Sequence, residues 1–256
     1  MPSIFISGGA AGIGRATALR FLSEGWTVGV YDVDRAALDA LKEEHPEVVT
    51  GALDVTDYGQ WEAALADFTE HTGGTLTVLD NNAGVLFAGD LDAIAPEQIK
   101  LQIDIDALGV TYGARAALPY LKDQPGAHLV NISSASAIYG QPGIATYSAA
   151  KFYVAGFTEA LELEWEKYGI RVVAIWPLWA KTALAENDAK STQTLGVKIT
   201  PEEVADQVWN SVNPRVKVPF LPRVHYSVGT MTTVLSNSSK FAPRSVVRLI
   251  NQFLSQ

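Results

Sequence analysis

Short apolar runs along the chain alternate with longer segments in which apolar residues recur every three or four positions. The short runs are typical of buried parallel strands and lie at 3–7, 27–32, 47–54, 75–80, 126–133, 170–176 and 216–220. The longer segments are typical of amphipathic helices and lie at 12–25, 34–45, 57–71, 96–122, 147–168 and 201–212. This order predicts an α/β fold, a Rossmann-like doubly wound parallel sheet, with residues 1–256 in a single domain. Residues 178–200 and 222–256 are predicted to form a variable substrate loop and a C-terminal extension.

A glycine-rich turn follows the first predicted strand. Residues 7–14 read Ser-Gly-Gly-Ala-Ala-Gly-Ile-Gly and lead into the first predicted helix. Glycines allow a tight turn and let a pyrophosphate approach the helix N-terminus, where free N–H groups favour anions. We therefore predict cofactor contacts at Gly8, Gly12, Ile13 and Gly14, although an ordinary strand-to-helix turn is the alternative interpretation.

The second predicted strand ends in an acidic residue, Asp32. A carboxylate about 20 residues beyond the glycine turn is placed to bind a ribose 2′-hydroxyl and to repel a 2′-phosphate. The sequence therefore predicts NAD as the cofactor in preference to NADP.

Tyr147 and Lys151 stand four residues apart, which places them on one face of a predicted helix. An ammonium ~4 Å from the phenol, at an effective dielectric constant of ~20, would favour the phenolate by about 4 kcal/mol, or roughly three pKa units. Tyr147 is thus predicted to titrate near neutrality and to exchange a proton with an alcohol oxygen, with Ser134 as a second hydrogen-bonding group. A half-buried or solvated helix face would show the same spacing, but the nucleotide-binding pattern favours catalysis.

Together these motifs resemble the short-chain dehydrogenase/reductase family, from Ser3 to about Thr182. The resemblance implies that Ser134 orients the substrate and that Tyr147 is the acid/base. It also implies that Lys151 binds the nicotinamide ribose and lowers the pKa of the tyrosine. Further cofactor contacts are implied at Ser7, which replaces the family's threonine, and at Asp54, Val55, Asn82, Ala83, Gly84, Pro177 and Thr182.

Two positions depart from the family pattern. Asp106 stands where the family usually has asparagine, and Leu178 stands where it usually has glycine. Asp106 could still hold the water of the family's proton relay through its backbone carbonyl, while its charge would offset part of the effect of Lys151 on Tyr147. Asp106 is therefore a fourth catalytic candidate, and Leu178 could reshape the substrate pocket or abolish it.

Composition narrows the range of partners. The chain has 19 basic and 28 acidic residues and a net charge of −9, which disfavours a nucleic-acid partner. Cysteine is absent, which excludes disulfides and thiolate metal sites, and the four histidines lack metal-ligand spacing, so no metal is expected. No apolar run approaches the ~20 residues that span a bilayer and no export leader is evident, so the predicted location is the cytoplasm.

Apolar side chains near the predicted nicotinamide end indicate the kind of substrate. Pocket candidates are Ile138, Tyr139, Trp176, Trp179 and Leu184, each of which could instead be core. Tyr139 and Trp179, with Ser134, are the predicted substrate contacts. Because Lys181 is the only cation there, we predict an apolar or aromatic ketone or secondary alcohol. The leading hypothesis is hydride transfer between NAD(H) and this small molecule, and the alternative is a non-catalytic NAD-binding sensor or interaction subunit.

The last segment of the chain bears on assembly. The family resemblance implies a homodimer or homotetramer. Residues 241–254 place apolar side chains at helical spacing, with Arg244 and Arg248 on another face. We predict that this segment docks within a homo-oligomer. Docking on its own domain and contact with an anionic membrane surface are the alternatives, and two arginines are few for stable membrane attachment.

Overall fold

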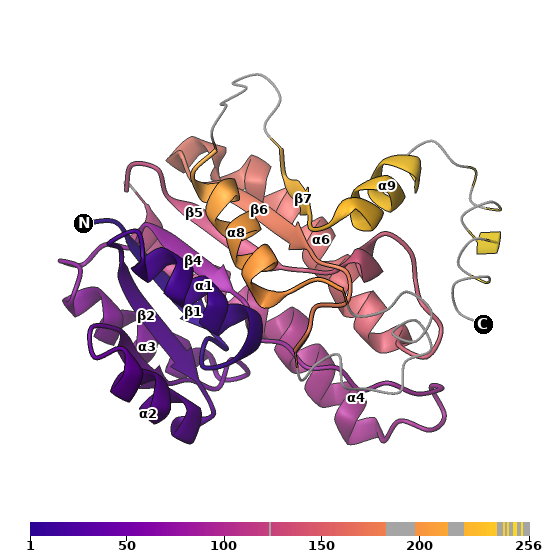
Figure 1. Cartoon of the computed structure of the whole chain (residues 1–256), viewed down its shortest axis with the longest axis horizontal. Coiled ribbons are helices and arrows are strands. Elements are labelled where there is room, and N and C mark those ends of the chain that lie inside the picture. The colour runs from indigo at the N-terminus through magenta and orange to yellow at the C-terminus, as the bar shows by residue number, and fades with distance from the viewer. Residues whose placement is uncertain are drawn as a thin grey trace.

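The computed structural model describes residues 1–122, 124–182, 198–214 and 223–239, together with residues 243, 245, 248, 249 and 252. A seven-stranded sheet lies at its centre in the order β3-β2-β1-β4-β5-β6-β7, and every neighbouring pair is parallel (Figure 1). The strands are β1 (Ser3–Ser7), β2 (Thr27–Asp32), β3 (Val49–Ala52), β4 (Val78–Asn81), β5 (His128–Ile132), β6 (Arg171–Trp176) and β7 (His225–Ser227). The predicted doubly wound parallel sheet is confirmed.

The helices agree with the predicted segments and add one more. They are α1 (Gly12–Leu22), α2 (Arg35–Glu44), α3 (Tyr58–Glu70), α4 (Pro96–Ile103), α5 (Val110–Leu121), α6 (Ala145–Trp165), α8 (Pro201–Val212) and α9 (Thr230–Ser239). The sequence predicted neither α9 nor β7, which is too short for a periodic signal. The strand predicted at 216–220 and most of the helix predicted at 241–254 lie outside the described residues.

The helix predicted at 96–122 is interrupted. α4 passes directly into η1 (Asp104–Gly109), a π-helical segment, and α5 follows. Short π-helical segments are rare and are frequently found at functional sites. Asp106 lies in this segment.

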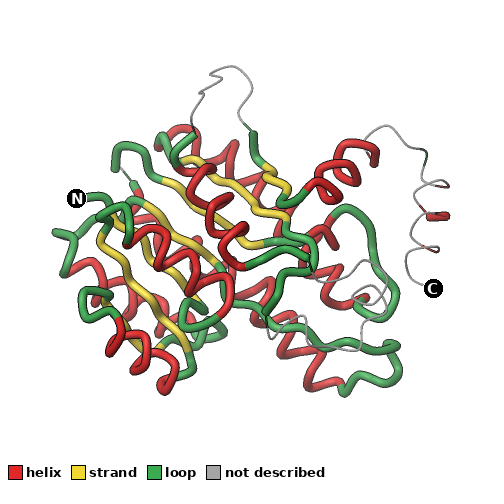
Figure 2. Tube along the Cα trace, in the orientation of Figure 1, coloured by secondary structure: helices red, strands yellow, loops and turns green. Residues whose placement is uncertain are grey.

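Alternate residues of the central strands pack against different helical layers. In β1, Ile4 and Ile6 pack with α1, α2 and α8, whereas Phe5 packs with α3, α5 and α6. Phe5 is fully buried and its ring stacks on Tyr31, with 4.4 Å between the ring centroids. Burying such a side chain stabilises the fold by about 1.5–3 kcal/mol. Figure 2 shows the strands between helices, so both faces of the parallel sheet are covered.

The carboxyl ends of the parallel strands meet at one edge of the sheet. β1 ends at Ser7, β2 at Asp32, β4 at Asn81 and β5 at Ile132. The predicted contact residues follow these ends in the sequence, so the topology brings them to the same edge. Among the described helices, none combines the length and the apolar character needed to cross a bilayer.

Candidate active site

The turn between β1 and α1 requires its glycines. Gly8 and Gly12 have φ angles of +65° and +54°, in the left-handed region that disfavours other residues. A Cβ on Gly8 would lie 2.6 Å from the Cα of Ala83, and one on Gly14 would lie 2.4 Å from the carbonyl oxygen of Gly8. No side chain caps the first turn of α1. The turn therefore presents the positive end of a helix dipole to an approaching anion.

Ser7 and Asn82 tie this turn to the segment after β4. The Asn82 amide nitrogen donates to the carbonyl oxygens of Gly8, at 2.7 Å, and of Ser7, at 3.1 Å. The Ser7 hydroxyl oxygen accepts from the backbone N–H groups of Asn82, at 3.2 Å, and Ala83, at 3.3 Å. These bonds hold two parts of the chain together that are separated by more than seventy residues.

Two carboxylates lie at the end of β2 and just after the end of β3. Asp32 accepts one backbone N–H on each oxygen, from Ala10 and from Asp34, both at 3.1 Å. Asp54 accepts from the backbone N–H of Thr56, at 2.9 Å, and from its hydroxyl, at 2.7 Å. Each carboxylate is thus held in one orientation before any ligand binds.

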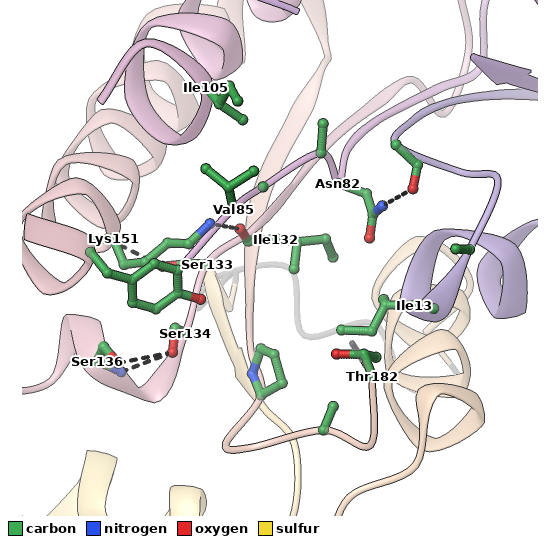
Figure 3. A pocket seen from close by; sticks show the side chains of 18 of the residues that line it. Ile13, Asn82, Val85, Ile105, Ile132, Ser133, Ser134, Ser136, Lys151 and Thr182 are labelled. Atoms are coloured by element: carbon green, nitrogen blue, oxygen red, sulfur yellow. Dashed lines mark hydrogen bonds between the residues drawn. The ribbon is translucent and has the colours of Figure 1, made fainter. Parts of the chain in front are cut away.

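A cavity of about 360 Å³ connects these groups with the start of α6. Figure 3 shows Ile13, Asn82 and Thr182 on one side of it and Lys151 and Ser134 on the other. The glycine turn suits a pyrophosphate and Asp32 suits an adenosine ribose. Lys151, which the family resemblance assigns to the second ribose, lines the same cavity. The residues present therefore fit a nicotinamide dinucleotide.

Lys151 is held deep in the site. Its ammonium donates to the carbonyl oxygen of Ile132, at 3.2 Å, and lies 3.8 Å from a carboxylate oxygen of Asp106. It also lies 5.3 Å from the centroid of the Tyr147 ring, one helical turn away on α6. The predicted common face of Tyr147 and Lys151 is thus present, and both side chains line the cavity.

Ser134 is positioned by its neighbour Ser136. The Ser134 oxygen accepts from the backbone N–H of Ser136, at 3.1 Å, and donates to its hydroxyl, at 3.2 Å. Ser134 also lowers the pKa of Tyr147, and both side chains line the same cavity. Ser134 and Tyr147 can therefore contact the same substrate oxygen.

The prediction that Tyr147 titrates near neutrality is wrong for the chain by itself. Burial raises the pKa of Tyr147 well above its ordinary value, and the charge of Asp106 raises it further, against a smaller effect of Ser134 in the other direction. The prediction failed because it took the attraction of Lys151 as the dominant effect on the phenol. It omitted the loss of water around the phenol, which is the largest effect, and it treated the charge of Asp106 only as a partial offset.

Asp106 lies behind Lys151 and is completely buried. Its Oδ1 accepts the backbone N–H of Val85 at 3.0 Å. Burial raises the pKa of Asp106 to about 6, although Lys151 and the bond from Val85 both lower it. Within the described residues, Oδ2 has no hydrogen-bond partner.

Most of the predicted site residues line the cavity. They are Gly8, Gly12, Ile13, Asp32, Asp54, Val55, Asn82, Ala83, Gly84, Ser134, Tyr147, Lys151, Pro177, Trp179 and Thr182. Ser7, Gly14 and Asp106 lie behind this wall and shape it. Tyr139 is buried and is not part of the wall, and Leu184 lies outside the described residues.

Sequence reasoning missed several lining residues. Val85 directly follows the predicted contacts Asn82, Ala83 and Gly84, and Ser136 lies two residues after Ser134, so proximity to predicted residues could have indicated both. Ile105 and Gln141 carried no signal, because a π-helical segment and a loop bring them to the site. Over the described residues, no group of three His, Asp or Glu side chains could hold a metal ion.

Comparison with known proteins agrees with this geometry. A family model for short chain dehydrogenases matches residues 2–193. Levodione reductase of Leifsonia aquatica is 30% identical over 251 residues, which cover 95% of this chain and 91% of that protein. The 3-oxoacyl-(acyl-carrier-protein) reductase FabG of Thermotoga maritima is 34% identical over 215 residues, which cover 79% of this chain and 87% of that protein. The crystal structure of a 3-ketoacyl-(acyl-carrier-protein) reductase from Brucella melitensis complexed with NADH has the same fold, with a TM-score of 0.80 and 24% sequence identity. The match covers 89% of this chain and 96% of that chain.

Proposed function

The chain belongs to the short-chain dehydrogenase family, and we propose that this oxidoreductase transfers a hydride between NAD(H) and a secondary alcohol or ketone. One observation carries the proposal. Ser134, Tyr147 and Lys151 line the same cavity as the glycine turn and Asp32. An acid/base group, a group that orients the substrate oxygen and a dinucleotide cradle are thus brought together, as this reaction requires.

The cofactor in this proposal is NAD rather than NADP. Asp32 lines the cavity with both carboxylate oxygens accepting backbone N–H groups. These bonds hold a negative charge where a 2′-phosphate would be repelled and a 2′-hydroxyl can donate. When bound, the nicotinamide supplies or accepts the hydride.

The residues of the chain move and hold the proton. In carbonyl reduction, Tyr147 donates its phenolic proton to the substrate oxygen while Ser134 donates a hydrogen bond to the same oxygen. In alcohol oxidation, the Tyr147 phenolate accepts the hydroxyl proton. The raised pKa of Tyr147 keeps the phenol protonated near neutral pH. The chain by itself therefore favours the reductive direction at neutral pH and the oxidative direction in alkaline solution.

The walls of the cavity favour an apolar substrate. Val85, Ile105, Leu178 and Trp179 contribute apolar surface, and among the described lining residues Lys151 is the one cation. A charged substrate would find no second cation to pair with in these walls. The similarity to a levodione reductase supports a ketone as substrate, whereas the similarity to FabG keeps an acyl thioester within the range to be tested.

Removing the phenolic hydroxyl tests the proposal. Tyr147→Phe keeps the ring but cannot transfer a proton, so turnover of an alcohol and ketone panel should fall ~100-fold or more while NADH binding persists. Tyr168→Phe, which removes a hydroxyl in the turn after α6, is the matched control. NADH absorbance reports turnover and NADH fluorescence reports binding. Tyr147→Phe activity near wild type would refute the mechanism, and NADH binding without turnover of any panel member would favour the sensor hypothesis.

We also propose that the chain forms a homo-oligomer. Large apolar side chains remain exposed on α4, η1 and α6, among them Leu101, Leu108, Phe152 and Leu163. A second copy of the chain would remove such side chains from water where they lie on the same face. Light scattering should give the mass of a dimer or tetramer, and a monomer would contradict the proposal. Cytoplasmic location stays a prediction.

A further inference from the structure

The cavity wall does not include Asp106, yet this side chain is in contact with the catalytic lysine. We propose that Asp106 is a positioning residue whose carboxylate holds the Lys151 ammonium and whose charge sets the pH range in which Tyr147 gives up its proton. The proposal rests on the proposed function, because it assigns Tyr147 as the acid/base. It goes further because it assigns to a second acid, Asp106, an influence on the pH at which Tyr147 loses its proton.

Geometry is the first argument. The Lys151 ammonium lies between the carbonyl oxygen of Ile132, at 3.2 Å, and Oδ1 of Asp106, at 3.8 Å. The same Oδ1 accepts the Val85 N–H at 3.0 Å, so the carboxylate is fixed from the segment after β4. At Gly84 a Cβ would lie only 2.9 Å from Oδ1. Residues 84 and 85 thus approach Oδ1 closely from the segment after β4, and Lys151 lies near it from α6.

Charge is the second argument. Two titratable side chains of α6 interact with the charge of Asp106: Lys151 lowers the pKa of Asp106, and Asp106 raises the pKa of Tyr147. The segment after β4 contributes a backbone N–H. Asp106 is 0% exposed and Lys151 is 3% exposed, so water screens their interaction little. A neutral asparagine could accept the Val85 N–H equally well. What the carboxylate adds is a charge, which attracts Lys151 and opposes formation of the Tyr147 phenolate.

The direction of the pH effect follows from burial. Burial raises the pKa of Asp106 to about 6, so the carboxyl group takes up a proton just below neutral pH. In the charged form it holds Lys151 and keeps the Tyr147 phenol protonated. In the neutral form both effects are lost. The alternative is that Asp106 serves only as the acceptor for Val85, in which case its charge would not change the pH profile of the activity.

A charge-neutral variant separates the two possibilities. Asp106→Asn keeps an acceptor for Val85 and removes the charge, so the acid limb of the alcohol-oxidation profile should move to lower pH by roughly one unit. Asp104→Asn is the matched control, since Asp104 lies in the same π-helical segment but is partly exposed and pairs with Lys100. The control should leave the profile unchanged.

A second measurement needs neither substrate nor cofactor. The folded-state pKa of Asp106 lies above its ordinary value of 3.8, so wild type should lose stability relative to Asp106→Asn as pH rises from about 4 to about 6. Urea unfolding across this range measures that difference, again with Asp104→Asn as control.

The outcomes are distinct. A shifted profile together with a stability difference that grows with pH supports the proposal. An unmoved profile, or an equal shift in Asp104→Asn, overturns it in favour of a simple acceptor. A stability difference that is flat with pH overturns it whether or not the chain turns over a substrate. Failure of the proposed function is recognised separately, by wild-type activity in Tyr147→Phe or by the absence of turnover in wild type.

Discussion

Asp80 is expected to make the stability of the fold depend on pH. It lies in β4 between Ile6 of β1 and Val130 of β5, is 0% exposed and faces the apolar layer formed with α1 and α8. Neither carboxylate oxygen has a hydrogen-bond partner among the described residues. Burial therefore raises the pKa of Asp80 to about 8 from an ordinary value of 3.8. Asp80 is expected to be protonated in the folded protein at neutral pH and ionised in the unfolded chain.

The sign and size of the effect follow from this difference. Between pH 3.8 and pH 8 the folded state binds more protons than the unfolded state at this group, so stability falls as pH rises through that range. Each pKa unit corresponds to about 1.4 kcal/mol. Because Asp80 must take up a proton on folding, it lowers the free energy of unfolding at pH 7 by up to about 4 kcal/mol. Between pH 6.5 and pH 8 the free energy of unfolding of the wild type should fall by about 2 kcal/mol because of this group. Asp106 contributes mainly below this interval, because its pKa is about 6.

The test is Asp80→Asn, which removes the ionisation with almost no change in volume. Urea unfolding at fixed protein concentration, followed by tryptophan fluorescence, should show that the variant is more stable than wild type at pH 8. The difference in unfolding free energy between Asp80→Asn and wild type should be about 2 kcal/mol smaller at pH 6.5 than at pH 8. Asp39→Asn, which neutralises an exposed acid on α2, should leave the pH dependence of wild type unchanged. If the unfolding free energies of wild type and Asp80→Asn run parallel between pH 6.5 and pH 8, Asp80 does not titrate there and the argument from burial fails.

Two further predictions concern the cofactor and the tail. Asp32→Ala removes the charge that opposes a 2′-phosphate, so the preference for NAD over NADP in kcat/KM should narrow, and a wild-type preference for NADP would contradict the assigned role of Asp32. Deleting residues 241–256 should lower the mass of the assembly in light scattering if this segment docks between subunits. Unchanged mass and stability of the truncated chain, together with flotation of the full-length chain on anionic liposomes, would favour the membrane alternative.

The sequence alone was enough to predict most of the fold and the outline of the site. Strand and helix order could be predicted because short apolar runs and the 3.6-residue period are local signals. The turn at Gly8 and Gly12 could be predicted because only glycine suits such a backbone. The places of Asp32 and Asn82 in the cavity wall followed from motif spacing. The break in the long helix at η1 and the strand β7 could not be predicted, because the first preserves an apolar pattern and the second is too short to have one.

Only the tertiary structure decided how the ionisable groups behave. Lys151 lies four residues from Tyr147 in the sequence, and this spacing suggested a phenol with a lowered pKa. Folding brings Asp106 to Lys151 and removes water from around all three groups, which raises the pKa of Tyr147 instead. Asp80 likewise looks ordinary in the sequence and becomes a buried acid without a hydrogen-bond partner among the described residues. Burial and charge depend on groups that are distant along the chain, so local pattern determines which residues form the site, and packing determines which of them carry a proton.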